Sequence, residues 1–393
     1  MNNRIYLDYN ATTPCEQEVV DHMLPFFNET YGNPSSAHHT YGWLAKEVIL
    51  DSTKIIAKTL GVAADDLIYT SGATESINMI LKSFSNKFER LGNHIITCKT
   101  EHKAVLDTCN FLEKYEGISV TYIDVDDKGL VDLDQLKKAI RPETIMISIM
   151  HSNNETGIIQ PLKKIRQIIE GKNIYIFSDA TQSLGKVDLD DVFESVDFAC
   201  FSAHKFYGPK GIGLVYAKDR SKNNILRSLI QGGGQQKMMR GGTINTSAIA
   251  GFAKALELCY TLGKKEQHRL MNLRNKLESG LLKIEGAFSN SIAADRLPNT
   301  LNISFTYVDG FKLLSALSKY MAVSNGSACN SANENPSHVL LAMGVDPNLA
   351  FSSIRFSAGR YTSESDIDKV IDIVVQEVKK LRASNILWER RST

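Results

Sequence analysis

Features that mark several classes of protein are missing from this sequence of 393 residues. Its six cysteines are scattered and form no CxxC pair or His/Cys cluster, which disfavours a zinc or iron–sulfur site built within one segment. No run reaches the ~18 apolar residues that span a bilayer, and the N-terminal segment lacks the residue order of a secretory signal peptide. We therefore expect a cytoplasmic protein without a membrane partner, in which the cysteines are free thiols.

The sequence also has no excess of charge of either sign. Lys and Arg total 45 against 44 for Asp and Glu, which gives a net charge of +1. Because nucleic-acid binding through counterion release needs clustered cations, we expect no direct nucleic-acid partner. Apolar residues make up 43% and charged residues 23%, the composition of a folded globular protein. At roughly 100 to 200 residues per domain, the length allows two or three structural units.

Short β-branched runs alternate with helical patterns between residues 66 and 217. This alternation is typical of a sheet with crossover helices, and runs that are apolar almost throughout indicate helices on both faces. We predict an α/β, doubly wound fold with a mainly parallel sheet flanked by helices. The expected strands are 67–70, 94–98, 120–125, 144–150, 174–178, 197–202 and 212–217, and the expected helices are 43–60, 74–90, 103–115 and 162–170.

A smaller α+β unit is expected after residue 258. A long helical pattern over 247–284 leads into it, with Gly251, Gly263 and Gly280 as candidate breaks. Its further elements are strands 301–305 and 353–357, helix 311–317 and a last helix from about residue 365, behind a capping box at Ser363 and Asp366. We predict a large unit of residues 16–258 and a small unit that combines 1–15 with 259–393.

Three polar residues follow predicted strands, at the carboxyl edge where α/β proteins bind ligands. Lys205 leaves its strand into a Gly-rich turn, and desolvation there would free its amine for Schiff-base chemistry. Asp179 needs a cationic partner once buried, such as the protonated pyridine nitrogen of pyridoxal phosphate (PLP). His102 would stack on a flat cofactor ring and exchange protons near neutral pH. Each has an ordinary alternative, namely an exposed lysine, a helix N-cap and a structural histidine.

The segment 69–76 joins strand 67–70 to the next helix and carries hydroxyl side chains and a glycine. Backbone amides at a helix N-terminus form a natural phosphate cradle, to which Thr74 would add a hydroxyl donor. Ser202 and His204 would reach the same phosphate. A capped strand–helix junction without a ligand looks identical, so the segment alone does not decide between the two.

Cys329 lies in a segment, 323–336, that has few large apolar residues. We expect this segment to be a long flexible loop, where a cysteine cannot act as a core filler. An inert exposed thiol is the alternative. As a nucleophile Cys329 would react as the thiolate, since the neutral thiol, with a pKa of about 8.5, reacts poorly.

Together these motifs resemble those of PLP-dependent cysteine desulfurases of the NifS/IscS type, within the class-V aminotransferase family. The resemblance runs in order from residue 5 to about residue 388, and it implies fold type I of the PLP-dependent transferases. The matching tracts are YLDYNATTP (6–14), TSGATES (70–76), TEHKAV (100–105), NNETG (153–157), DATQS (179–183), SAHKFYGPKG (202–211), SNGSAC (324–329) and SSIRFS (352–357).

The resemblance implies a role for each matching residue. Lys205 would hold PLP and carry the substrate Cα proton, His102 would act with it as an acid–base group, and Cys329 would be the nucleophile. No metal site is implied, except that Cys329 could transiently ligate an iron–sulfur cluster. The PLP-binding residues would be Thr74, His102, Asn154, Asp179, Gln182, Ser202, His204, Lys205 and, from the second subunit of a homodimer, Thr243. Asn154 and Arg355 would bind the substrate carboxylate, for which a guanidinium is well suited.

The implied function is that of a cysteine desulfurase, which converts L-cysteine to L-alanine and transfers sulfur to Cys329 as a persulfide, then to an acceptor protein. The acceptor would serve iron–sulfur cluster assembly, tRNA thiolation or DNA phosphorothioation, and the sequence does not choose among them. Two enzymatic alternatives keep PLP: a selenocysteine lyase and an aminotransferase of the same fold. A binding platform without catalysis is disfavoured, because Lys205, Asp179 and Cys329 are all present.

Overall fold

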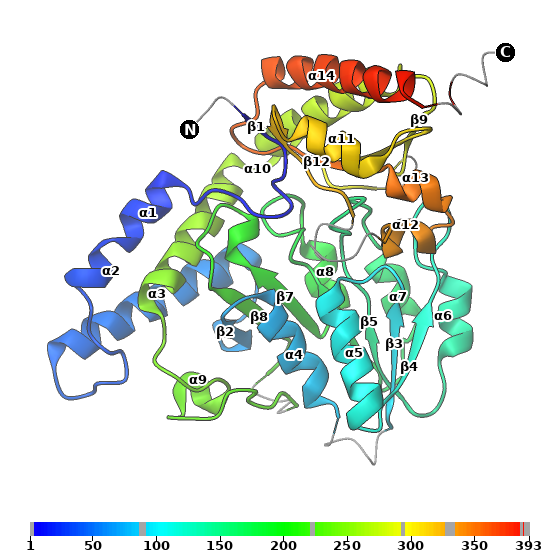
Figure 1. The fold of residues 1–393 in the computed structure, drawn as a ribbon. Helices are drawn as coiled ribbons and strands as arrows, with labels where there is room; N and C mark the ends of the chain where they lie inside the picture. The colour runs from blue at the N-terminus through cyan, green and yellow to red at the C-terminus, as the bar shows by residue number, and fades with distance from the viewer. Residues whose placement is uncertain are drawn as a thin grey trace.

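The computed structural model describes residues 4–85, 92–220, 225–291, 295–326, 335–385 and Trp388. At its centre lies a seven-stranded sheet with strand order β2-β8-β7-β6-β5-β3-β4 (Figure 1). Strands β4, β3, β5, β6 and β7 run parallel, whereas β8 is antiparallel to both of its neighbours, so the predicted mainly parallel sheet is confirmed. The strands are β2 (Leu67–Thr70), β3 (His94–Cys98), β4 (Ser119–Ile123), β5 (Thr144–Ser148), β6 (Tyr175–Asp179), β7 (Phe198–Ser202) and β8 (Gly213–Ala217).

Neighbouring residues of the central strands enter two separate apolar cores, one on each face of the sheet. On β3, Ile95 packs into the core under α4 and α5, while Ile96 packs into the core on the opposite face. This burial on both faces explains why the strands are apolar almost throughout. The helices of this part are α1 (Gln17–Met23), α2 (Pro25–Asn28), α3 (Thr40–Leu60), α4 (Ala73–Ser83), α5 (Lys103–Tyr115), α6 (Leu133–Ala139), α7 (Leu162–Ile168), α8 (Asp190–Ser195), α9 (Gln235–Met238) and α10 (Thr246–Leu281).

The predicted element boundaries agree with the structure to different degrees. Strands 67–70 and 94–98 are β2 and β3 to the residue, and the other strands of this sheet differ from the prediction by one or two residues at one or both ends. The helix predicted over 74–90 instead ends at Ser83. Phe84 is buried there, and its ring centroid lies 5.8 Å from that of Phe198 on β7, so the chain turns towards the core.

Glycines set helix ends and close approaches. α3 ends at Gly61, which has the left-handed φ of +69° that favours glycine, and α10 is interrupted at Gly263, where φ is +43°. Gly251 and Gly280 do not interrupt α10, so these two predicted breaks were wrong. A Cβ on Gly251 would lie only 2.5 Å from Met23 Sδ, and the missing side chain lets α1 pack closely against α10.

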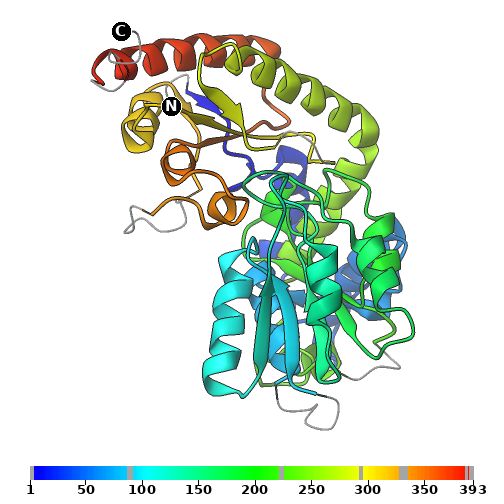
Figure 2. The same ribbon diagram turned by 90° about the vertical axis from the view of Figure 1, so that its right-hand side faces the viewer.

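A second group of elements lies above the central sheet (Figure 2). It contains a three-stranded sheet of order β12-β10-β9 and a parallel pair of β1 with β11. Its elements are β1 (Ile5–Tyr6), β9 (Ala287–Ser289), β10 (Thr300–Phe305), β11 (Met321–Ala322), β12 (Ile354–Ser357), α11 (Gly310–Leu317), α12 (His338–Ala342), α13 (Pro347–Phe351) and α14 (Glu364–Ala383). The predicted capping box of Ser363 and Asp366 is present at the start of α14.

The N-terminal segment enters this second group. Leu7 is fully buried in an apolar core that also contains residues of β10, α11, α14 and the C-terminal half of α10. The division into residues 16–258 and residues 1–15 with 259–393 stays a prediction, and α10 runs through residue 258. Among the described residues, no helix has the length and apolar character needed to cross a bilayer.

Candidate active site

The carboxyl edge of the central sheet brings predicted site residues together. β6 ends at Asp179 and β7 at Ser202, and the short turn Ala203–Lys205 follows β7 directly. His102 follows β3 and interacts electrostatically with both Asp179 and Lys205. Because the ends of parallel strands share one edge, residues far apart in the sequence meet there.

Carbonyl groups of the N-terminal segment hold the amine of Lys205. Its Nζ donates to the backbone oxygens of Asn10, at 2.7 Å, and Ala11, at 2.8 Å. The lysine is therefore directed inward, over the sheet edge, and is not an exposed lysine beside a turn.

Asn10 connects the sheet to the second group of elements, and sequence analysis assigned it no role. It is 1% exposed, and its backbone oxygen accepts from Gln182 Nε2 at 2.9 Å as well as from Lys205. Its side-chain nitrogen donates to Thr300 Oγ1 at 2.8 Å and to the Asn154 carbonyl at 3.1 Å. The residue lies within the tract 6–14, but its partners are distant in the sequence, so local pattern could not identify them.

Asp179 is 8% exposed at the end of β6. Its Oδ1 accepts from the Thr181 amide at 3.0 Å and from Cys200 Sγ at 3.6 Å. The alternative interpretation as a helix N-cap is wrong, since the next α-helix, α8, begins only at Asp190. The carboxylate is held in place at the sheet edge and can face a cationic group of a ligand.

His102 is the N-cap of α5, and its Nδ1 accepts from the Ala104 amide at 3.1 Å. A neutral imidazole bonded in this way carries its proton on Nε2. Burial lowers the pKa of His102, while the nearby Asp179 raises it and Lys205 lowers it. The ring is thus neutral near pH 7, and its Nε2–H takes no part in the hydrogen bond that caps α5.

The turn before α4 has the form of an anion cradle. Gly72 is the N-cap of this helix, and no side chain of the described residues caps it. A Cβ on Gly72 would lie 3.7 Å from Ser202 Oγ, and a Cβ on Gly213 would lie 2.6 Å from Gly72 Cα. The turn, the end of β7 and β8 therefore meet without side-chain bulk, and Thr74 is exposed in the first turn of α4.

His204 lies beside the same edge, where its Nδ1 is 3.0 Å from Thr12 Oγ1. Burial, and to a smaller extent the charges of Lys205 and Lys210, lowers its pKa to about 4. A neutral ring there can donate a hydrogen bond to an anion without adding charge.

Arg355 and Asn154, the predicted carboxylate-binding residues, are brought together. Arg355 Nη1 donates to the backbone oxygen of Asn154 at 3.0 Å, and Nη2 donates to Asp8 Oδ1 at 2.7 Å. The Nε of Arg355 is buried and has no hydrogen-bond partner among the described residues. Arg355 is thus already paired with a carboxylate from the N-terminal segment, which sequence analysis did not find.

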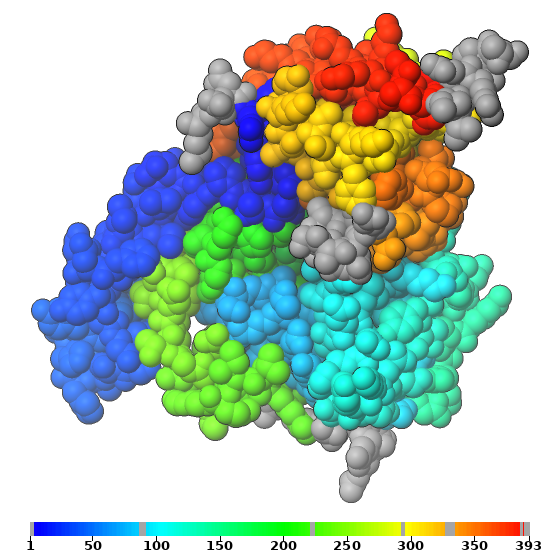
Figure 3. Space-filling model, viewed as in Figure 1, coloured from blue at the N-terminus to red at the C-terminus, as the bar shows by residue number. Residues whose placement is uncertain are grey.

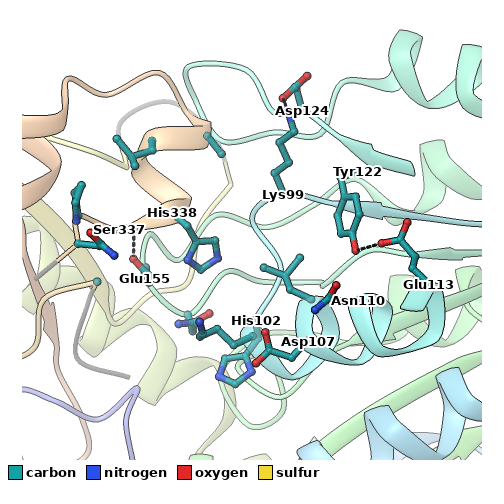
Figure 4. A pocket seen from close by; sticks show the side chains of 18 residues that line it. Lys99, His102, Asp107, Asn110, Glu113, Tyr122, Asp124, Glu155, Ser337 and His338 are labelled. Atoms are coloured by element: carbon teal, nitrogen blue, oxygen red, sulfur yellow. Dashed lines mark hydrogen bonds and ion pairs between the residues drawn. The ribbon is translucent and has the colours of Figure 1, made fainter. Parts of the chain in front are cut away.

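A pocket of about 1000 Å³ lies between α5 and α12. Figure 4 shows His102 on one side of it and His338 with Ser337 and Glu155 on the other. Ser337 Oγ donates to Glu155 Oε2 at 2.5 Å, and a Cβ on Gly326 would lie 2.3 Å from the same oxygen. The buried Glu155 carboxyl, whose pKa burial raises, therefore accepts a hydrogen bond from Ser337 and lies close to the backbone of Gly326.

The chain is similar to known proteins over almost its whole length. Residues 5–370 match the model of the family Aminotransferase class-V. The chain is similar to the cysteine desulfurase IscS of Actinobacillus succinogenes, with 45% identity over 387 residues, 98% of this chain and 95% of that one. The IscS of Anaeromyxobacter sp. strain Fw109-5 is 43% identical over 386 residues, with the same two coverages.

The protein belongs to the cysteine desulfurases of the class-V aminotransferase family. Among solved structures, a NifS-like protein matches with a TM-score of 0.88 and 39% identity, covering 96% of this chain and all of that one (100%). DndA from Streptomyces lividans matches with a TM-score of 0.76 and 34% identity, covering 90% of this chain and 99% of that one. The predicted family and fold are confirmed.

Two predicted site residues of this cysteine desulfurase family member are not placed beside Lys205 by the structure. Cys329 lies outside the described residues. Thr243 is exposed on the segment between α9 and α10, and its role in the site of a second subunit stays a prediction. Sequence analysis missed Asp8, Asn10, Glu155 and Lys186. The amine of Lys186 donates to Gln182 Oε1, and its position four residues after Gln182 could have indicated this contact.

Proposed function

We propose that this protein is a PLP-dependent cysteine desulfurase that converts L-cysteine to L-alanine and holds the sulfur as a persulfide on Cys329. The observation that carries this proposal is the meeting of Lys205, Asp179 and His102 at one sheet edge. An inward-directed amine, a fixed carboxylate and a neutral imidazole are the groups that PLP chemistry requires.

The residues at this edge fit PLP. The glycine turn before α4 leaves room for a phosphate, which the first amides of that helix, Thr74, Ser202 and His204 would bind. Asp179 would pair with the ring nitrogen, and His102 would lie against the ring. PLP would then supply an electron sink for a carbanion at the substrate Cα.

In this site the chain's own residues carry the protons and the sulfur. Lys205 Nζ takes the proton from the substrate Cα, and the Nε2–H of His102 acts as a hydrogen-bond and proton donor towards the substrate sulfur side. The Cys329 thiolate attacks the substrate sulfur, so an S–S bond forms as the Cβ–S bond breaks. The Cβ atom keeps the electron pair of the broken bond and takes up a proton, which yields the methyl group of alanine.

We propose the substrate carboxylate site at Arg355 and Asn154. Arg355 is 7% exposed, and its planar guanidinium is suited to a carboxylate. When no substrate is bound, the carboxylate of Asp8 balances the positive charge of Arg355. The substrate carboxylate therefore competes with, or shares the guanidinium with, this carboxylate.

We propose a homodimer through the flank formed by α1, α2, α3 and the segment around α9 (Figure 3). Large apolar side chains are exposed on these elements, with Phe27 62%, Tyr31 60%, Trp43 55% and Met238 76% exposed. Exposed apolar side chains grouped in this way mark an association surface. Thr243, close to Met238 in sequence, would then reach the site of the second subunit.

We propose that the persulfide sulfur passes to a second protein, in the cytoplasm. Iron–sulfur cluster assembly, tRNA thiolation and DNA phosphorothioation are the candidate destinations. Capture of proteins by the persulfidated enzyme, with the Cys329→Ala variant as the control, distinguishes these destinations.

The test of the reaction is a comparison of Cys329→Ala with Cys15→Ala, a half-buried cysteine away from the pocket. PLP-loaded protein is supplied with L-cysteine, and alanine and protein-bound persulfide are measured. We expect loss of both products in the first variant and wild-type amounts in the second. Undiminished alanine formation by Cys329→Ala would contradict the proposal.

The same assay separates the alternatives. A selenocysteine lyase forms alanine from selenocysteine and not from cysteine, whereas an aminotransferase forms a keto acid and does not need Cys329. A binding platform shows no visible absorbance after PLP is added.

A further inference from the structure

A second buried lysine lies next to the amine of Lys205. Lys186 is 7% exposed, and its Nζ donates to Gln182 Oε1 at 2.7 Å and to Asn10 Oδ1 at 3.3 Å. Long lysine side chains rarely lie inside proteins unless they are paired, so this burial has a cause in its partners. The proposed mechanism gives Lys186 no part.

The contacts of Lys186 determine which end of the Gln182 amide faces which neighbour. The amine of Lys186 donates to two oxygens, Gln182 Oε1 and Asn10 Oδ1, so it faces the oxygen end of the amide, and the backbone oxygen of Asn10 selects the nitrogen. Gln182 Nε2 donates to that oxygen at 2.9 Å. A hydrogen-bond donor, Lys186 Nζ, thus fixes the oxygen of the amide, and an acceptor, the Asn10 carbonyl, fixes its nitrogen.

The amide nitrogen is fixed beside the reactive amine. Lys205 Nζ and Gln182 Nε2 both donate to the backbone oxygen of Asn10, at 2.7 and 2.9 Å. A group joined to the Lys205 amine therefore lies next to the N–H of Gln182. An anionic oxygen on such a group would be stabilised by this donor, and it would be destabilised by the amide oxygen in the reversed orientation.

We propose that Lys186 is a positioning residue: it fixes the amide of Gln182 so that its N–H donor, and not its oxygen, faces the group carried by Lys205. This inference rests on the proposed function, in which that group is PLP. Burial lowers the pKa of Lys186 well below its ordinary value, and the charges of Lys205 and Arg355 lower it further. A neutral amine keeps the donors that the amide needs and adds no charge beside Lys205.

Replacing the amine has a defined consequence. In Lys186→Met the chain volume is retained, but Gln182 Oε1 loses its donor inside the protein. A buried acceptor without a partner is costly, and only the Asn10 backbone oxygen then still favours the original orientation of the amide. Because one of its two fixing contacts is lost, we expect the amide to populate the reversed orientation, with its oxygen towards the PLP site.

The experiment is a pH titration of the visible absorbance of PLP bound to the enzyme, which does not depend on turnover. We expect the midpoint to rise by about one pH unit in Lys186→Met, because a donor to the anionic form is lost. Lys164→Met, an exposed lysine on α7, is the matched control and should titrate as the wild type. Equal midpoints in Lys186→Met and the wild type would overturn the inference.

A double-variant cycle tests whether Lys186 acts through Gln182. In a Gln182→Met background the added Lys186→Met change should produce no further shift, and a full additional shift would refute the positioning role. If Lys186→Met does not fold, Gln182→Glu replaces it, because its carboxylate still accepts from Lys186 and lacks the donor. Gln182→Glu should show the same upward shift, and a wild-type midpoint would count against the inference. Absence of visible absorbance in wild-type protein would instead refute the proposed function.

Discussion

The buried imidazole of His94 predicts how the stability of the sheet depends on pH. His94 begins β3 and is 0% exposed, with Nδ1 2.8 Å from Thr144 Oγ1 and Nε2 2.8 Å from Thr121 Oγ1. Burial, and to a smaller extent the charge of Arg141, lowers its pKa to about 4. The neutral ring is therefore part of the folded sheet, at the end away from the candidate site.

The sign and size of the effect follow from the two pKa values. In the unfolded chain the pKa is about 6.5, so below that pH the unfolded chain gains a proton that the folded protein does not take up. The contribution of His94 to stability is present above pH 6.5 and is lost as the pH falls towards 4. The loss is about 2 kcal/mol between pH 7 and pH 5 and about 3 kcal/mol at pH 4.

The substitution His94→Gln removes this titration and keeps a polar side chain for the two threonines. We expect the variant to be less stable than the wild type by about 1 to 2 kcal/mol at pH 7. At pH 5 the difference should shrink by about 2 kcal/mol, because only the wild type loses stability through this group. Urea unfolding of both proteins at pH 7, 6 and 5 measures it, with PLP at the same saturating concentration.

The pH dependence of the stability difference, together with a control variant, tests this prediction. If the stability difference between His94→Gln and the wild type is the same at pH 7 and pH 5, the reasoning is refuted. The control is His268→Gln, on the exposed surface of α10. The difference in unfolding free energy between this variant and the wild type should be the same at each pH, which shows that the pH effect requires a buried imidazole.

Three further predictions concern the candidate site. Asp8→Asn should lower the KM for L-cysteine by about threefold to tenfold, since the Arg355 charge is then less compensated, and a raised KM would show that Asp8 is needed to hold Arg355. Gly213→Ala should weaken PLP binding by at least about tenfold in a fluorescence titration, because the added Cβ meets Gly72 at 2.6 Å, and unchanged affinity would contradict the cradle. Asp179→Asn should reduce alanine formation by about a hundredfold or more while the Tm changes by less than about 4 °C, and retained activity would remove Asp179 from the mechanism.

The sequence predicted those parts of the fold that depend on local pattern. The strands of the central sheet were found because they are apolar on both faces, and the break at Gly263 was found because glycine tolerates its backbone angles. The same rule failed at Gly251, where the glycine serves close packing against Met23 and the helix continues. A glycine's sequence position does not reveal what lies opposite it.

The candidate site was predicted in the same uneven way. Lys205, Asp179 and His102 were found because each follows a strand, and the parallel sheet then brings them to one edge. Lys186 and Asn10 were missed because 176 positions separate them in the sequence, and neither carries a local signal of the contact. Contacts of this kind depend on how the two groups of elements pack together. A short stretch of sequence carries no information about that packing.

The position of the Lys205 amine is determined outside the sheet to which Lys205 belongs. The carbonyls that hold it come from residues 10 and 11, and Tyr6, only four residues earlier, is paired with β11. Four residues span at most about 14 Å, so these carbonyls have little freedom of their own. Asn10 is also bonded to Ser357 and Thr300, so a shift of the upper elements relative to the sheet would withdraw both carbonyls at once. The N-terminal segment is thus a short tether through which the second group of elements can act on the lysine without touching it.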